Sequence, residues 1–368
     1  MMNQDHYNEL LKLVENRTVT KQQRGMDMIV KQIPDSDVEG TLDPRVLNVM
    51  QQQAEAMAGF EAPDMSKINP IELAHMLRKQ MGWPNTDVTR TGIQVDARNI
   101  TGRNGEIPIR IYTPTVQNAS DRLPVVVFFH GGGFFGGTLD VVENPCKAIA
   151  EKGPAVVVSV DYRLAPEHPY PAGLHDCFDA VKWTYEHADE LGADKTKLAV
   201  AGDSAGGNLA TVCSMMDRDL GTGMIQFQVL IYPTVNMAGV NTDDFEWKLE
   251  EYTIHDHQPY IMAGLEGMRQ SSDLLDAIYL QGREKPMHPY VSPLLADLKG
   301  MPKALVITAE YDFLRLEGEA YARKLQSSGV PVTLIRYNGL DHAFMDKIGL
   351  YPQAEDCMAE IAKQAAKL

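Results

Sequence analysis

Short apolar runs recur along the chain from about residue 90 to its end, and they have the length of buried β-strands. They occupy residues 125–129, 155–160, 198–201, 227–232, 304–308 and 332–337. Helix-like segments separate these runs, which predicts a mostly parallel central sheet flanked by helices, an α/β fold. Alternating segments at 92–97 and 107–112 predict an opening hairpin, and residues 352–366 predict the last helix.

Two segments do not fit this alternation, residues 1–89 and the insert 235–295. In the first, Asp43-Pro44 and Asn69-Pro70 each place a capping side chain before a proline, which predicts the starts of two helices. Gly59 is expected to end the first of them. Most of the insert's large side chains are expected to pack between helices, and some to face a ligand pocket. These side chains are Phe245, Trp247, Tyr252, Tyr260, Met262 and Met268.

Residues 202–206 read Gly-Asp-Ser-Ala-Gly and lie between the apolar run 198–201 and a helix-like run. Small residues around a serine permit a tight strand-to-helix turn, which lifts the Ser204 hydroxyl out of the sheet. The same turn points the N-terminus of the helix at a developing oxyanion. The pattern alone is weak evidence, because small residues are common and produce it by chance.

A second motif strengthens the first. Residues 130–134 read His-Gly-Gly-Gly-Phe and directly follow the strand-like run 124–129. Three glycines leave bare peptide N–H groups that approach a ligand closely, although such a run alone is more typical of a flexible turn. Because each motif follows its own strand, the pair predicts a nucleophile and an oxyanion hole, the two halves of acyl-transfer catalysis.

Together these motifs resemble those of the α/β-hydrolases of the hormone-sensitive-lipase group, microbial carboxylesterases with His-Gly-Gly-Gly and Gly-Asp-Ser-Ala-Gly-Gly sequences. Residues 161–172, which include Tyr-Arg-Leu-Ala-Pro-Glu, resemble a third signature of the group. The resemblance extends from about residue 92 to the C-terminus. It implies an α/β-hydrolase catalytic core over residues 90–368, with residues 1–89 and the insert 235–295 forming a helical cap over the active site.

A serine nucleophile needs a base, and in this fold an acid and then a histidine follow the serine along the chain. Among ten histidines, His342 is the predicted base, because it lies on a short turn after the strand-like run 332–337. It would remove the proton from Ser204 as the hydroxyl attacks an ester carbonyl, and water would then hydrolyse the acyl-enzyme.

The predicted acid is Asp312, which follows the strand-like run 304–308 at the place where the resemblance puts it. It would fix the imidazole tautomer and stabilise the imidazolium. Phe313 stands where the group usually has Pro or Val, a departure that leaves the carboxylate untouched. Three neighbouring carboxylates are interpreted as a solvated helix start: Glu310, Glu317 and Glu319.

The tetrahedral oxyanion is expected to be received by the N–H group of Ala205 and by the glycine run. The resemblance places the donors of this run on Gly132 and Gly133, and the sequence leaves Gly131 open as a further donor. It also gives His130 a structural role in the loop, which excludes that residue as the base. No metal or organic cofactor is expected.

Composition narrows the class of protein. A chain of 368 residues suits an α/β core with a cap, and 50 Asp and Glu against 34 Lys and Arg argue against nucleic-acid or membrane partners. The four cysteines lack metal-ligand spacing, and Cys177 and Cys213 are expected to be buried thiols. The polar N-terminus does not resemble a signal peptide, so the cytoplasm is expected. Assembly into a homo-oligomer, such as a dimer, stays open.

Three functions are weighed. A serine carboxylesterase acting on small-molecule esters is the first. An amide or carbamate hydrolase would use the same triad, and a non-catalytic receptor would usually lack a triad residue. Phe134 and Phe135 after the glycine run, with a cap rich in Met and aromatic residues, predict a closed pocket for short-to-medium acyl chains of about two to eight carbons.

Overall fold

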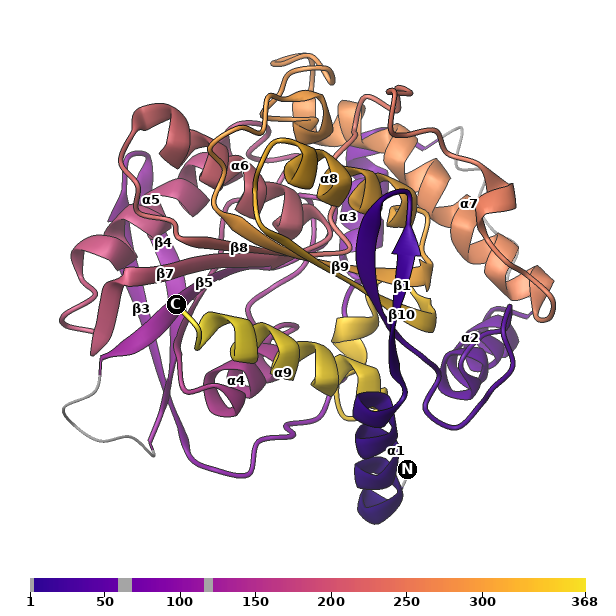
Figure 1. Cartoon of the computed structure of the whole chain (residues 1–368). Coiled ribbons are helices and arrows are strands. Elements are labelled where there is room, and N and C mark those ends of the chain that lie inside the picture. Colours follow the sequence, from indigo (N-terminus) through magenta and orange to yellow (C-terminus); the bar gives the residue numbers. More distant parts are fainter. Residues whose placement is uncertain (1–2, 59–67, 116–121) are drawn as a thin grey trace.

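The computed structural model describes residues 3–58, 68–115 and 122–368, and in them a single sheet lies between two layers of helices (Figure 1). The strands of the sheet are β1 (Thr18–Gln23), β2 (Met26–Lys31), β3 (Ile93–Gly102), β4 (Gly105–Pro114), β5 (Leu123–Phe129), β6 (Val156–Val160), β7 (Ala193–Asp203), β8 (Phe227–Ile231), β9 (Lys303–Tyr311) and β10 (Val332–Asp341). The order across the sheet is β1-β2-β10-β9-β8-β7-β5-β6-β4-β3. All six predicted core strands and the opening hairpin, now β3 and β4, are confirmed.

The helices cover both faces of the sheet. Along the chain they are α1 (Gln4–Asn16), α2 (Pro44–Met57), α3 (Pro70–Arg78), α4 (Glu143–Lys152), α5 (Ala172–Glu186), α6 (Ala205–Leu220), α7 (Gln258–Leu275), α8 (Arg315–Ser327) and α9 (Pro352–Ala365). Helices α1, α4 and α9 pack on one face, whereas α5, α6 and α8 cover the other (Figure 1). No helix in the described part of the chain is long and apolar enough to cross a membrane.

The strand order changes direction at β5, and this places the site. Strand β6 pairs with one side of β5 and β7 with the other, all three parallel. In an open parallel sheet, the loops after two such strands diverge to opposite faces and leave a crevice at their carboxyl ends. The glycine run follows β5 and Ser204 follows β7, so the two predicted motifs meet at this crevice.

The predicted starts of two helices in the N-terminal segment are confirmed. The Asp43 carboxylate accepts a hydrogen bond from the N–H of Arg45, two residues into α2, at 2.8 Å. The Asn69 side chain accepts one from the N–H of Ile71 in α3 at 2.9 Å. Both contacts satisfy N–H groups that have no partner within the helix. Gly59, the predicted end of the first helix, lies outside the described residues.

The expectation of a purely helical segment over residues 1–89 needs a correction at β1 and β2. These strands form an antiparallel hairpin, and β2 pairs in parallel with β10, so the hairpin extends the main sheet. The physical reason is an alternation within β2, where Met26, Met28 and Val30 are buried against the core. This period of two, preceded by an Arg24-Gly25 turn, is a strand signal that was available in the sequence.

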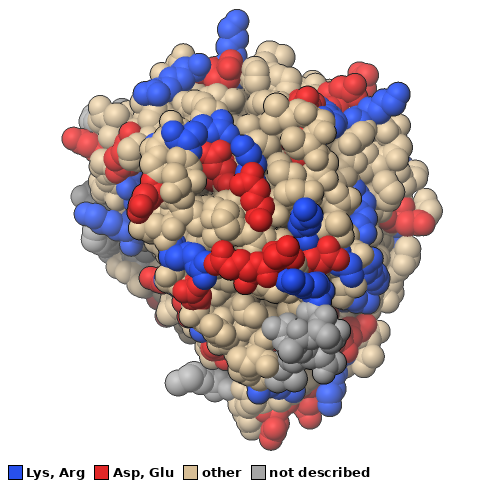
Figure 2. Space-filling view, turned by 90° about the vertical axis from the view of Figure 1, so that its left-hand side faces the viewer, with Lys and Arg blue, Asp and Glu red and all other residues tan. Residues whose placement is uncertain are grey.

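Charged side chains of both signs are interspersed on the face seen in Figure 2. Exposed ion pairs such as Arg98–Glu190 occur on and beside β3. Exposed pairs of this kind stabilise a fold only slightly, because both partners remain hydrated. On this face the net negative charge is therefore offset locally by neighbouring Lys and Arg side chains.

The cap insert leaves the core directly after β8 and is anchored there by Glu317 of α8. The buried Glu317 carboxylate accepts hydrogen bonds from the N–H groups of Val235 at 2.6 Å and Asn236 at 3.2 Å. Burial raises the pKa of Glu317 to about 7, although these N–H donors favour its charged form. The interpretation of Glu317 as a solvated residue is therefore wrong, since it joins the insert to the core.

Glu317→Gln is expected to change the pH dependence of stability. Because folding raises the pKa of this carboxyl from 4.5 to about 7, the free energy of unfolding falls as the pH rises through this window. Glutamine keeps an acceptor oxygen but has no charge to desolvate, so the variant should gain on the order of 3 kcal/mol relative to wild type between these limits. Urea unfolding at a series of pH values measures this difference.

The matched control for this measurement is Glu246→Gln, which changes an exposed glutamate of the same insert. Its stability difference from wild type should stay flat over the same pH range. An equally flat difference for Glu317→Gln would contradict the expectation.

Candidate active site

Ser204 stands at a sharp turn between β7 and α6. Its backbone has φ 53° and ψ −115°, a conformation that costs a non-glycine residue of order 1–3 kcal/mol. The turn is possible only because its neighbours are small. A Cβ on Gly202 would lie 2.3 Å from the backbone of Gly206, and a Cβ on Gly206 would lie 2.0 Å from the carbonyl oxygen of Phe129. The Gly-x-Ser-x-Gly pattern is thus a steric requirement of this turn.

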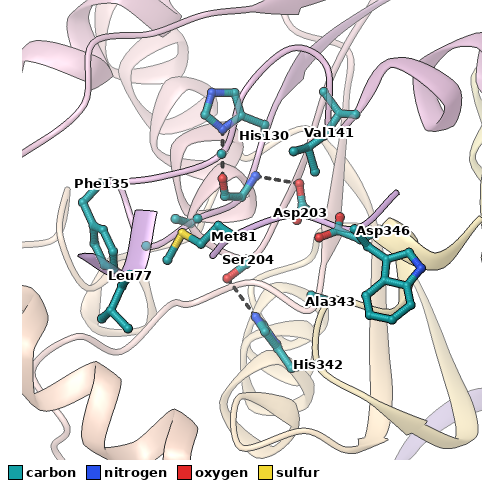
Figure 3. Close-up of a pocket in the computed structure, with 18 of the residues that line it drawn as sticks. Leu77, Met81, His130, Phe135, Val141, Asp203, Ser204, His342, Ala343 and Asp346 are labelled. Carbon is teal, nitrogen blue, oxygen red and sulfur yellow. Dashed lines mark hydrogen bonds between the residues drawn. The ribbon is translucent and has the colours of Figure 1, made fainter. Parts of the chain in front are cut away.

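The loop of residues 130–137, here called the oxyanion loop, continues from β5 and folds tightly beside Ser204. Gly132 adopts φ +119°, which L side chains rarely tolerate, and its carbonyl oxygen accepts hydrogen bonds from the N–H groups of Phe135 and Gly136. The side chain of Asp203 accepts a hydrogen bond from the N–H of Gly131 at 2.7 Å. The residue before Ser204 therefore holds the start of this loop (Figure 3).

His130 at the start of this loop is fully buried and stacks on the ring of Tyr162 at 4.4 Å. Burial lowers the pKa of His130 to about 4, so its imidazole is neutral, and Nδ1 donates to the carbonyl oxygen of Gly131 at 2.8 Å. The Tyr162 hydroxyl donates to the carbonyl oxygen of His130 at 2.7 Å. These contacts fix the loop and leave His130 outside the hydrogen-bonded line described next.

Three predicted residues from three different strand ends come together in one line. Asp312 follows β9, His342 follows β10, and Ser204 follows β7. The Nδ1 atom of His342 lies 2.7 Å from the Oδ2 atom of Asp312, and its Nε2 atom lies 3.1 Å from the Oγ atom of Ser204. Because a carboxylate only accepts hydrogen bonds, Nδ1 donates and Nε2 is left with a lone pair facing the serine hydroxyl.

The other carboxylates near this line have partners of their own. The side chain of Glu310 accepts from the N–H of Gly339 at 2.7 Å, and Glu319 is buried in an ion pair with Arg336. Neither residue is the solvated group that the sequence suggested, because the end of β9 and the start of α8 lie inside the core. Among the predicted carboxylates, Asp312 is the one that bonds to His342.

The negatively charged groups around His342 favour its protonated form. Burial alone would lower the pKa of His342, but the negative charge and hydrogen bond of Asp312 raise it above its ordinary value of 6.5. Asp203 and Asp341 add smaller contributions in the same direction. The arrangement therefore makes His342 a stronger base than an isolated imidazole.

The sequence analysis did not single out a pair of carboxyl groups beside the site, those of Asp203 and Asp346. Both side chains line the pocket near Ser204 and His342 (Figure 3), and that of Asp203 is buried. Burial, together with the negative charge of Asp346, raises the pKa of Asp203 to about 8, and the pKa of Asp346 is also raised. Both carboxyl groups therefore favour the protonated form more than an isolated aspartate does. Asp203 lies inside the serine motif, whereas no local pattern marks Asp346.

A pocket of about 420 Å³ opens above Ser204 and His342. The cap forms much of its wall, with Leu77 and Met81 from the N-terminal segment and Met268 and Leu275 from the insert. Phe135 of the oxyanion loop also faces it (Figure 3), whereas Phe134 is buried elsewhere and stacks on Tyr279 at 3.9 Å. A partly apolar pocket with a few polar groups at its floor is typical of a small-molecule site.

The large side chains of the insert divide as expected between packing and the pocket. Of the six named in the sequence analysis, Met268 lines the pocket, while Tyr252 and Trp247 brace the loop that carries Asp312. The Tyr252 hydroxyl donates to the carbonyl oxygen of Asp312 at 2.8 Å, and Trp247 packs against Phe313. Phe313 thus supplies a surface for the cap at the position where it departs from the hormone-sensitive-lipase group.

Cysteine thiols and clusters of metal-ligating side chains are the other groups that could carry chemistry in this protein. The four cysteines are buried and free, as expected for Cys177 and Cys213. Within the described residues, no group of three or more His, Cys, Asp and Glu side chains is arranged to hold a metal ion.

Comparison with known proteins agrees with this geometry. Residues 126–346 match the family described as alpha/beta hydrolase fold. Carboxylesterase NlhH of Mycobacterium tuberculosis is 39% identical over 295 residues, which cover 78% of this chain and 86% of that protein. An arylesterase of Saccharolobus solfataricus is 36% identical over 242 residues, covering 65% of this chain and 73% of that protein.

Comparison with solved structures also finds esterases. The hyperthermophilic esterase from Pyrobaculum calidifontis superposes with a TM-score of 0.69 at 38% sequence identity, covering 89% of this chain and 98% of that one. A thermophilic carboxylesterase cloned from a metagenomic library superposes with a TM-score of 0.65 at 35% identity, covering 82% and 97%. The chain therefore belongs to the α/β-hydrolase fold family, in its hormone-sensitive-lipase group, and is a carboxylic ester hydrolase.

Proposed function

We propose that the chain hydrolyses short-to-medium acyl-chain esters through a Ser204–His342–Asp312 triad and an acyl-enzyme intermediate. The observation that carries the proposal is the unbroken hydrogen-bonded line from the Asp312 carboxylate through His342 to the Ser204 hydroxyl, at the floor of a pocket. A serine hydroxyl becomes an effective nucleophile when an adjacent base removes its proton. His342 is that base, and Asp312 holds its tautomer and stabilises the imidazolium.

In this proposal the oxyanion is received by the N–H groups of Ala205, Gly132 and Gly133. Ala205 is the first residue of α6, where N–H groups have no partner within the helix. Gly132 and Gly133 both have positive φ, which turns their peptide groups in a way that ordinary residues rarely allow. One well-placed donor to an oxyanion is worth about 3 kcal/mol in the transition state.

The substrate in this proposal is a small-molecule ester whose acyl chain has about two to eight carbons. The pocket of about 420 Å³ is walled by the cap, so a chain gains burial only while it fits inside. The related proteins described as carboxylesterase and arylesterase support an ester bond as the target. Residence in the cytoplasm and assembly into a dimer stay predictions.

Two other functions are less well supported. Hydrolysis of an activated amide or carbamate would use the same line of residues, and rates on a matched ester and anilide would separate the two. A non-catalytic receptor would leave the hydrogen-bonded line without a purpose. Loss of ester hydrolysis in a Ser204→Ala variant would exclude such a receptor.

Ser204→Ala should abolish ester hydrolysis while leaving the fold intact, because the hydroxyl supplies chemistry and little packing. Turnover of p-nitrophenyl butyrate and circular dichroism measure the two effects. An organophosphate should label the wild-type protein on the peptide that contains Ser204, read as a mass shift. Normal turnover by a folded Ser204→Ala protein would contradict the proposed mechanism.

Asp312→Asn should lower kcat by roughly 10⁴, because the imidazole loses the group that fixes its tautomer. The rate should rise with pH as His342 loses its proton, and in wild type this limb lies above the ordinary value of 6.5, because Asp312 raises the pKa of His342. The residual limb in the variant should therefore move to lower pH. Profiles of kcat/KM against pH test both effects, with Glu310→Gln as the control that should retain activity.

Activity should rise and then fall along a series of p-nitrophenyl esters from acetyl to palmitoyl. Leu275→Ala removes part of the cap wall and should shift the optimum to a longer chain, whereas Leu274→Ala, whose side chain does not line the pocket, should not. Initial rates on each ester give the optimum. Efficient hydrolysis of emulsified long-chain triglyceride would rule out the proposed chain length.

A further inference from the structure

Arg78 stands where the cap meets the core. It is the last residue of α3; Leu77 before it and Met81 three residues after it line the pocket. The pocket-lining stretch of residues 77–83 is followed by a second tie to the core, where the N–H of Thr86 donates to the carbonyl oxygen of Ile348 at 3.1 Å. This wall of the pocket is thus hydrogen-bonded to the core at both ends, and Arg78 provides the contacts at the α3 end.

The Arg78 guanidinium bonds to two separate loops of the core. Its Nε atom donates to the carbonyl oxygen of Phe135 in the oxyanion loop. Its Nη2 atom donates to the carbonyl oxygen of Ala165 at 2.6 Å and to the Oε2 atom of Glu167 at 2.7 Å, while Nη1 donates to Oε1 of Glu167 at 2.9 Å. We call these contacts of Arg78 with Phe135, Ala165 and Glu167 the clasp.

The two core loops in the clasp are also bonded to each other. The N–H of Ala165 donates to the carbonyl oxygen of Phe134 at 2.9 Å, so the peptide next to the one that Arg78 binds is held by the second loop. The clasp therefore joins three segments that are remote in sequence: α3, the oxyanion loop and the loop after β6. A shift of α3 larger than the Arg78 side chain can follow would either break its bond to the Phe135 carbonyl oxygen or move that carbonyl.

The geometry of the clasp suits its charges. The fork of an arginine side chain matches a carboxylate with two parallel hydrogen bonds, and Arg78 uses this arrangement on Glu167. The guanidinium of Arg78 lowers the pKa of Glu167 to about 2, and the Nε2 atom of His75 lies 3.1 Å from the same carboxylate. Glu167 stays ionised over the whole range in which an esterase is assayed.

Glu167 is 45% exposed, and Arg78 is 29% exposed. A pair at this degree of exposure adds little to the overall stability of a fold, because water competes for both charges. Its effect should therefore be local and should concern where α3 sits more than whether the core folds.

We propose that Arg78 is a positioning residue that couples the placement of the α3 cap helix to the conformation of the oxyanion loop. The proposal rests on the proposed function, since the coupled loop matters for catalysis only if it receives the oxyanion. A loosened clasp would weaken substrate contact through Leu77 and Met81 and misplace the N–H donors next to Phe135. Both kcat and KM should respond.

The test compares Arg78→Met and Glu167→Gln with a matched control, Arg98→Met. Arg98 lies on β3 and, like Arg78, pairs with carboxylates, those of Asp96 and Glu190. Arg78→Met should lower kcat/KM for p-nitrophenyl butyrate about tenfold, with a lower kcat and a higher KM. Glu167→Gln should have a smaller effect, because the bonds to the Phe135 and Ala165 carbonyl oxygens remain. The double variant should be within about twofold of Arg78→Met, and Arg98→Met should match wild type.

Hydrogen exchange supplies a readout that needs no hydrolysis. In Arg78→Met the amides of residues 70–81 and of residues 131–137 should both exchange faster, while those of β7 and β8 keep their wild-type rates. Faster exchange in α3 alone, with unchanged kinetics, would overturn the coupling. A uniform increase that includes β7 would overturn it as well, since that result describes general destabilisation. Failure of the wild type to hydrolyse esters or to be labelled at Ser204 would count against the proposed function instead, because the exchange result is independent of it.

Discussion

The site depends on one steric constraint, the close approach of the serine turn to the end of β5. A side chain on Gly206 would collide with the carbonyl oxygen of Phe129, and one on Gly131 would collide with the carboxylate of Asp203. Without side chains at these positions, the backbone after β5 and the backbone after β7 pack directly against each other. Ser204 and the glycine loop thereby lie close together, and the strained backbone of Ser204 is held by its surroundings.

Much of the core could be predicted from the sequence, because its strands are buried on both faces and read as continuous apolar runs. The strand–turn–helix context of Ser204 and the glycine run after β5 are local signals of the same kind. Strand β1 is different. Its side chains are mostly exposed and polar, and its place in the sheet depends on the pairing of β2 with β10, about 300 residues away. Local periodicity carries no information about such a pairing.

The order of residues along the chain indicated His342, and the resemblance to the hormone-sensitive-lipase group indicated Asp312, but neither could show how the supporting groups are arranged. Asp346 meets Asp203, and Arg78 meets Phe135, only after the fold brings distant segments together. The same is true of Glu317, which the sequence placed on a solvated helix start. Glu317 and Glu319 are buried, and the partners of both, the N–H groups of Val235 and Asn236 and the Arg336 guanidinium, follow no spacing rule.

The hairpin of β1 and β2 has a consequence for the sheet as a whole. Over residues 334–337 strand β10 has a neighbour on each side, so the backbone groups of this stretch are not available for pairing with another chain. On this side the sheet ends instead at β1, a strand of six residues. Its exposed residues include Thr20, Lys21 and Gln22. A short polar edge with a lysine is a poor template for a further strand. The N-terminal segment therefore closes a surface along which sheets of separate molecules could otherwise join.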